Sequence, residues 1–221
     1  VNSSGYATVI SPSYIVSVRH NGGYNSVDFG NNALCKTKYV LINRNESATQ
    51  DLHVPRLNKV VTEAAPVAMV KGTELAADKQ RYQWYARVGA GNQYQVDAAT
   101  QTLAWLSGAD NWKSGGTITD PAFENWRLRW YNYSPDDPRV QPLDSAPQAG
   151  DSGSPMFVYD SQQQIWKLAG VVTSVAGSTP YSLKGYVLFL QDKLIEEVMA
   201  ANTDPAVTDQ KSQGDILWTA D

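Results

Sequence analysis

The 221-residue sequence has few of the side chains that crosslink a chain or hold a metal: one cysteine, Cys35, and two histidines, His20 and His53. A single thiol permits no internal disulfide. Together with both histidines, this thiol is still one ligand short of a tetrahedral zinc site. We therefore expect neither a disulfide framework nor a bound metal.

Charge is also scarce, at 18% of the residues, and 22 acidic residues outnumber 18 basic ones, giving a net charge of −4. This balance repels polyphosphate, so we expect no nucleic-acid partner. The apolar runs, such as VAMV at residues 67–70, are far shorter than the ~20 residues that cross a bilayer as a helix. No basic and then apolar leader opens the sequence, so we expect any signal peptide to have been removed or to lie upstream.

The short apolar segments are rich in β-branched and aromatic residues and are separated by Gly, Pro, Asn and Ser, which is typical of an all-β domain. We assign the seven Trp and 12 Tyr to structural packing rather than to ligand stacking. One amphipathic helix is expected over residues 191–202, because its apolar residues recur at helical spacing. The expected strands are residues 7–11, 14–19, 39–43, 57–61, 82–88, 102–107, 126–131, 155–159, 166–174 and 185–190, with one more at 215–219 after a polar connection at 203–214.

The segment GDSGSP at residues 150–155, followed at once by an apolar strand, has the features of a nucleophilic serine turn. Nucleophilic catalysis needs a hydroxyl on a tight turn, with backbone N–H groups converging on the oxygen that becomes negative. Glycines on both sides of Ser152 allow such a turn, and the N–H groups of Gly150 and Ser152 would form the oxyanion hole. The alternative is an ordinary Gly/Ser turn before a strand.

A serine is a poor nucleophile unless a base removes its proton, and the chain has only two histidines to do so. We expect His20 to be the base, because it follows an apolar strand and precedes a turn, and we assign His53 a structural role. The orienting carboxylate is expected to be Asp51, which would accept the imidazole Nδ1–H. Asp28 is the rival, but it follows His20 closely and is expected to face solvent on a hairpin.

The chain order of these residues decides between classes of serine hydrolase. An α/β-hydrolase has the order serine, acid, histidine, and no histidine follows Ser152. A subtilisin-like order needs an acid before the histidine and an α/β sheet, which the strand-rich pattern does not support. The order His20, Asp51, Ser152 is that of the two-barrel β proteases.

Three stretches carry a resemblance to a known family: YIVSVRHNGGY at residues 14–24, DLHVPRLNKVVTE at 51–63 and GDSGSP at 150–155, with weaker similarity over WKLAGVVT at 166–173. The chain resembles the chymotrypsin-like peptidase domain of the serine protease autotransporters of enterobacteria and of the related immunoglobulin A proteases. The resemblance implies a double six-stranded β-barrel with a C-terminal helix, and the catalytic roles given above. It also implies a longer protein with a β-helical stalk and its own membrane barrel for export, hence a secreted or bacterial cell-surface location.

The same resemblance implies a division of the chain and a specificity. Residues 1–75 would be the barrel half that carries His and Asp, residues 76–190 the half that carries Ser, and residues 191–221 a helix and connection. Ala146, six residues before the nucleophile, would lie at the base of the primary pocket, and its lack of charge predicts a small or apolar residue before the cut. Thr173, Ser174 and Val175 would form the strand beside the substrate backbone, with Val175 narrowing the pocket.

We therefore expect a monomeric, secreted serine endopeptidase that needs no cofactor and cleaves host extracellular proteins, possible substrates being mucin-type glycoproteins. The alternative from another class is an adhesin module that binds host glycoproteins on the same fold, with its catalysis lost or incidental. The enzyme is favoured, because a decayed protease would be expected to lose at least one of three residues that serve no purpose singly.

Overall fold

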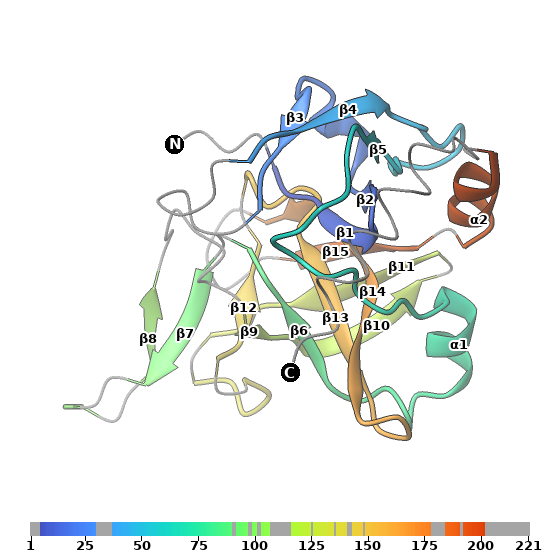
Figure 1. The fold of residues 1–221 in the computed structure, drawn as a ribbon. Coiled ribbons are helices and arrows are strands. Elements are labelled where there is room, and N and C mark those ends of the chain that lie inside the picture. Colours follow the sequence, from blue (N-terminus) through green and yellow to red (C-terminus); the bar gives the residue numbers. More distant parts are fainter. Residues whose placement is uncertain are drawn as a thin grey trace. The chain divides into compact units, whose positions relative to one another are not determined.

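The computed structural model describes residues 5–29, 37–89, 92–96, 99–100, 103–106, 116–124, 126–134, 136–140, 143–147, 149–177, 184–190 and 192–201. The internal contacts divide the chain into two compact units (Figure 1). The histidine unit comprises Ala7–Ala68 and Gln191–Asp221, and the serine unit comprises Val1–Tyr6 and Met69–Leu190.

The histidine unit contains one antiparallel five-stranded sheet in the order β1-β2-β5-β4-β3. Its core consists of apolar side chains from alternating strand positions, among them Val9, Ile15 and Leu57. The strands are β1 Thr8–Ser11, β2 Tyr14–Val16, β3 Ser26–Val27, β4 Tyr39–Asn43 and β5 Arg56–Leu57, and a short 3-10 turn, η1 Arg19–Asn21, follows β2.

Helix α2 (Asp192–Ala201) also belongs to the histidine unit. Its Ile195 is buried, whereas Lys193, Glu196 and Glu197 are exposed. The amphipathic helix predicted at this place is therefore confirmed.

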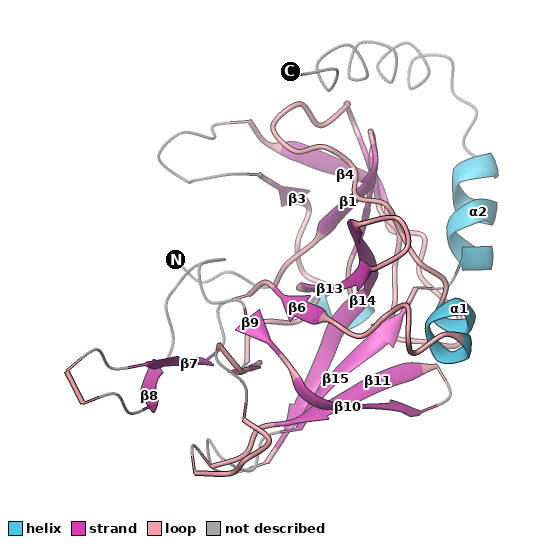
Figure 2. Cartoon of the chain, turned by 90° about the horizontal axis from the view of Figure 1, so that it is seen from below, coloured by secondary structure: helices cyan, strands magenta, loops and turns pink. Residues whose placement is uncertain are grey.

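The serine unit contains a seven-stranded sheet in the order β10-β11-β15-β14-β13-β6-β9 (Figure 2) and a three-stranded sheet in the order β12-β7-β8. Strand β11 has the alternating pattern of a strand with one face in the core: Leu128 and Trp130 are fully buried, and the residues on either side of them are half-buried. The bounds are α1 Gly72–Ala77, β6 Tyr85–Arg87, β7 Asn92–Val96, β8 Leu103–Leu106, β9 Gly116–Thr117, β10 Thr119–Glu124, β11 Arg127–Tyr131, β12 Ser145–Ala146, β13 Pro155–Asp160, β14 Ile165–Ala176 and β15 Lys184–Phe189.

The predicted all-β class with a C-terminal helix is confirmed. The structure adds the short helix α1, whose six residues bury only Leu75 and are too few to show a helical period. The strand predicted over residues 14–19 ends at Val16: Ser17 forms only an isolated bridge with His53, and η1 begins at Arg19. The connection and strand predicted at 203–219 lie outside the described residues. Within the described ranges, no helix is long and apolar enough to span a membrane.

Candidate active site

His20 lies on η1, directly after the first strands of the histidine unit. Beyond β2, Ser17 and His53 exchange two backbone hydrogen bonds, of 3.2 and 3.0 Å. The turn is held by Asn21, whose N–H donates to the Val18 carbonyl (3.3 Å) and whose amide donates to the Ser17 hydroxyl (3.3 Å). The His20 side chain is 45% exposed. The η1 turn therefore places it at the surface of the histidine unit, where a reactive group has to be accessible.

Asp51 lies on a loop that folds around the side chain of Ser47. The Ser47 hydroxyl accepts hydrogen bonds from the backbone N–H groups of Thr49 (3.3 Å) and Gln50 (3.2 Å). Arg19 links this loop to η1, because its guanidinium donates to the Ser47 carbonyl (3.0 Å) and its backbone N–H to the Asp51 carbonyl (3.4 Å). The two predicted residues therefore approach each other from segments that are tied together through their backbones.

The carboxylate of Asp51 binds His20 through both of its oxygens. Oδ1 accepts the His20 backbone N–H at 2.9 Å, and Oδ2 lies 2.5 Å from the ring Nδ1. A carboxylate at this position fixes the tautomer with the proton on Nδ1, so that Nε2 carries the lone pair of the ring. Asp28, the rival carboxylate, instead follows strand β3.

His53 lies in the interior of the histidine unit, with no exposed surface. Its Nε2 is hydrogen-bonded to the Tyr24 hydroxyl at 2.8 Å, and the two rings meet edge to face. Burial, assisted by the charge of Arg44, lowers the pKa of His53 to about 4, so the ring is neutral at physiological pH. This buried, neutral histidine fits the structural role expected for it.

Ser152 lies on a tight turn of the serine unit. The N–H of Ser154 donates to the Asp151 carbonyl at 2.9 Å, and Gly150 and Gly153 have φ of +102° and +85°, in the region that favours glycine. The turn is tied to β14, since Gly153 N–H donates to the Val172 carbonyl and Val172 N–H to the Ser154 carbonyl, both at 2.8 Å. Ser152 itself is half-buried, and its carbonyl accepts the Tyr6 N–H at 2.8 Å.

The predicted pocket residues also belong to the serine unit. Ala146, in β12, is fully buried. Strand β14 pairs with β13 up to Val171. In the part of the chain that the structure describes, Ser174 and Val175 pair with β15 alone, and the register shifts at Thr173. Ser174 is exposed, and Thr173 and Val175 are half-buried. This short stretch of β14 therefore has an edge at which a substrate backbone can pair.

Arg87 was not identified as a site residue from the sequence. Its side chain is buried beside the turn that carries Ser152. Its side chain is fully buried and forms an ion pair with Asp151, at 3.2 Å between Nη1 and Oδ2. The signal was present: in a strand that alternates inward and outward, Tyr85 and Arg87 take inward positions. An inward arginine requires a buried partner.

Each unit thus holds part of the predicted site. His20 and Asp51 are in contact within the histidine unit, and Ser152, Gly150, Ala146 and residues 173–175 belong to the serine unit. Among the residues that the structure describes, no group of three or more His, Cys, Asp or Glu side chains could hold a metal ion.

One protein family, described as Immunoglobulin A1 protease, matches residues 1–192 of the 221. The chain belongs to this family. The resemblance drawn from the sequence motifs is therefore confirmed.

Several relatives are named autotransporters. The "Adhesion and penetration protein autotransporter" of Haemophilus influenzae is 32% identical over 225 residues, covering 92% of this chain and 16% of the relative. The "Serine protease SepA autotransporter" of Shigella flexneri is 30% identical over 225 residues, covering 98% and 16%. These names bear out the predicted location, which is secreted or at the bacterial cell surface.

A solved structure supports the fold. The crystal structure of the Haemophilus influenzae Hap adhesin matches with a TM-score of 0.65 at 28% identity, covering 91% of this chain and 22% of that one. The match confirms the predicted fold class. The chain spans less than a quarter of the length of each of these proteins.

Proposed function

We propose that the chain is the peptidase domain of a secreted serine endopeptidase, in which His20, Asp51 and Ser152 act as a catalytic triad. The observation that carries the proposal is the pair of hydrogen bonds that Asp51 accepts from His20, one from the backbone N–H and one from the ring Nδ1. A carboxylate bound in this way orients an imidazole so that it can act as a base. The membership of the chain in a protease family supports the same role.

In this mechanism, His20 Nε2 accepts the proton of the Ser152 hydroxyl as Oγ attacks the scissile carbonyl. Asp51 stabilises the imidazolium that forms. The N–H groups of Gly150 and Ser152 donate to the oxyanion, and each such donor contributes roughly 10²–10³ in rate. His20 then protonates the leaving amine, and water hydrolyses the acyl-enzyme. The mechanism needs no cofactor.

The residue before the cut is proposed to be small or apolar. Ala146 has no charge to offer Lys or Arg, and Val175 takes up space on the exposed stretch of β14. A peptide library cleaved by the full-length protein should therefore give products that end in small or apolar residues. A majority of products ending in Lys or Arg would contradict this assignment.

Labelling with an organophosphonate tests the triad, because the reagent reacts with an activated serine. We expect a covalent adduct on Ser152, none on Ser152→Ala, and labelling roughly 10⁴-fold slower in Asp51→Asn. Asp28→Asn is the matched control and should label at the normal rate. A folded wild-type protein that is not labelled, or an Asp51→Asn variant that labels normally, would overturn the triad.

An adhesin is the second candidate function, and the relatives favour it: one is named an adhesion and penetration protein and another is the Hap adhesin. In that case the monomeric passenger, exported through its own membrane barrel, binds host glycoproteins without cleaving them. Incubation with purified mucin separates the two functions. Fragmentation that disappears in Ser152→Ala supports the protease, and retention of intact mucin without labelling of Ser152 supports the adhesin.

A further inference from the structure

We infer that Arg87 is a positioning residue, which holds the Ser152 turn and the predicted pocket base in a fixed relation to each other. This inference rests on the proposed function, because it assigns Arg87 a part in the reaction of Ser152. All the residues that carry it belong to the serine unit.

The guanidinium of Arg87 contacts two separate segments of the chain. Nη1 donates to the Asp151 carboxylate (3.2 Å), which belongs to the Ser152 turn. On the other side, Nε donates to the Ser145 hydroxyl (3.1 Å), and Nη2 donates to the Ala146 carbonyl (2.6 Å). One planar group with fixed donor directions therefore bridges the nucleophile turn and strand β12.

Burial makes these contacts obligatory. Arg87 is 1% exposed and the Asp151 side chain is fully buried, so neither charge has water as an alternative partner. Removing one partner of such a pair takes away a charge that the buried environment cannot replace with water. The burial lowers the pKa of Arg87, and the negative charge of Asp151 opposes that effect.

Gly89 shows how closely the backbone is fitted around this ion pair. A Cβ at Gly89 would lie 2.7 Å from Asp151 Oδ1 and 2.8 Å from Arg87 Nη1. No side chain fits there unless the pair moves. The pair can therefore be disturbed without removing either charge.

The position of Asp151 connects this ion pair to catalysis. Asp151 stands between Gly150 and Ser152, whose N–H groups are the proposed oxyanion donors. The Ser152 N–H belongs to the peptide plane that begins at the Asp151 carbonyl. When Arg87 fixes the Asp151 side chain, it restricts rotation of this plane and so keeps the donor aimed. Preorganised donors of this kind stabilise the transition state without reorganising during the reaction.

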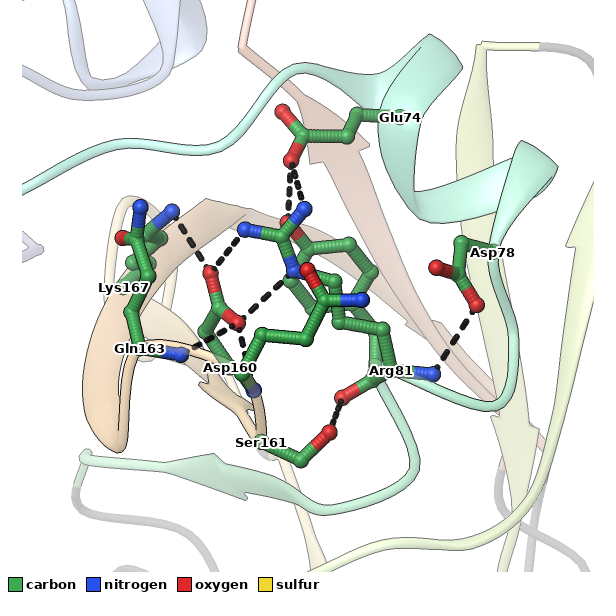
Figure 3. A network of polar contacts seen from close by, with 9 residues as sticks. Glu74, Asp78, Arg81, Asp160, Ser161, Gln163 and Lys167 are labelled. Atoms are coloured by element: carbon green, nitrogen blue, oxygen red, sulfur yellow. Dashed lines mark hydrogen bonds and ion pairs between the residues drawn. The ribbon is translucent and has the colours of Figure 1, made fainter.

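The test compares Arg87→Gln and Gly89→Ala with a matched control, Arg81→Gln. Arg81 belongs to the same unit and also pairs with a fully buried carboxylate, that of Asp160, at 2.6 Å (Figure 3). Two quantities are measured on folded protein: the rate of organophosphonate labelling of Ser152, and the hydrogen exchange of the amides of Gly153 and Ser154. Both amides donate within or beside the turn.

We expect Arg87→Gln and Gly89→Ala to slow labelling by about 10–100-fold and to speed exchange of the two turn amides. The Arg81→Gln control should lose comparable thermal stability, yet label within about threefold of the wild type with unchanged turn exchange. If Arg87→Gln does not fold, Gly89→Ala decides, because it keeps both charges.

The two readouts separate this inference from the proposed function. Normal turn exchange and normal labelling in folded Arg87→Gln or Gly89→Ala would overturn the role of Arg87 and leave the triad intact. Equal effects in Arg81→Gln would also overturn it, because the effect would then be one of general stability. A wild-type protein that is never labelled would instead overturn the proposed function, while the exchange data still decide whether Arg87 holds the turn.

Discussion

At the scale of single residues, His53 couples the stability of the protein to pH. Its ring is fully buried, and its pKa of about 4 lies well below the ordinary 6.5. Between these values an unfolded chain binds a proton at this histidine and the folded chain does not. The free energy of unfolding therefore falls as the pH is lowered from 6.5 to 4. Above pH 6.5, His53 causes no loss of stability.

We predict that His53→Gln removes this dependence. Urea unfolding at pH 7.5 and at pH 4 should show the wild type losing roughly 2–3 kcal/mol more than the variant. Glutamine can still hydrogen-bond to the Tyr24 hydroxyl, which limits the loss at neutral pH. Equal losses in the two proteins would mean that His53 titrates normally in the folded state.

A second residue-scale prediction concerns Gly150, whose φ of +102° is one that L side chains rarely adopt. Gly150→Ala should strain the turn by about 1–3 kcal/mol and slow organophosphonate labelling of Ser152 by more than tenfold. Gly23→Ala is the control, because a Cβ there would meet no atom within 4 Å. A Gly150→Ala variant that labels like Gly23→Ala would show that the turn tolerates a side chain.

At the scale of elements, the hairpin of β13 and β14 is anchored by a buried carboxylate. Asp160 accepts two hydrogen bonds from Arg81, at 2.7 and 2.6 Å, and pairs with Lys167 at 2.8 Å (Figure 3). The backbone N–H groups of Gln162 and Gln163 complete its partners, at 3.1 Å each. These hydrogen bonds and the two cations hold the pKa of Asp160 below its usual range.

We predict that Asp160→Ala lowers the melting temperature by roughly 5–10 °C at pH 7, since Arg81 and Lys167 lose a shared partner. Because the pKa of Asp160 is depressed, its contribution is present above the ordinary carboxyl pKa and is lost as the pH falls toward the folded value. The gap between the two proteins should thus narrow below about pH 4. Asp137→Ala, which breaks a surface pair with Arg139, should change the melting temperature little.

The elements also show what the sequence could predict. Strands such as β11 and β13 were predictable because period-two burial is a local property. The tight turn at Ser152 was predictable for the same reason, since it needs glycines within two positions. Arg87 was not, because its partners lie 58 to 64 residues away, and no local pattern indicates which buried carboxylate it meets.

At the scale of the whole molecule, the residues of the proposed triad come from both units. Unfolding of either unit should therefore abolish activity. Leu57 and Leu128 are fully buried, one in the core of each unit. We predict that Leu57→Ala and Leu128→Ala each cost about 2–5 kcal/mol and each lower the temperature at which Ser152 stops reacting with an organophosphonate. Calorimetry locates the unfolding transitions. Labelling that survives above the transition lowered by Leu57→Ala would show that the histidine unit is dispensable.

The distribution of these groups has a consequence for the newly made chain. The hydrogen bond between Asp51 and His20 lies within the histidine unit, and the hydrogen bonds described for the Ser152 turn lie within the serine unit. If the proposed triad is the active site, a molecule in which only one unit has folded holds either the proton acceptor or the attacking hydroxyl, never both. Under the proposed function, immature copies would not cleave one another, and self-digestion would begin only among molecules that have finished folding.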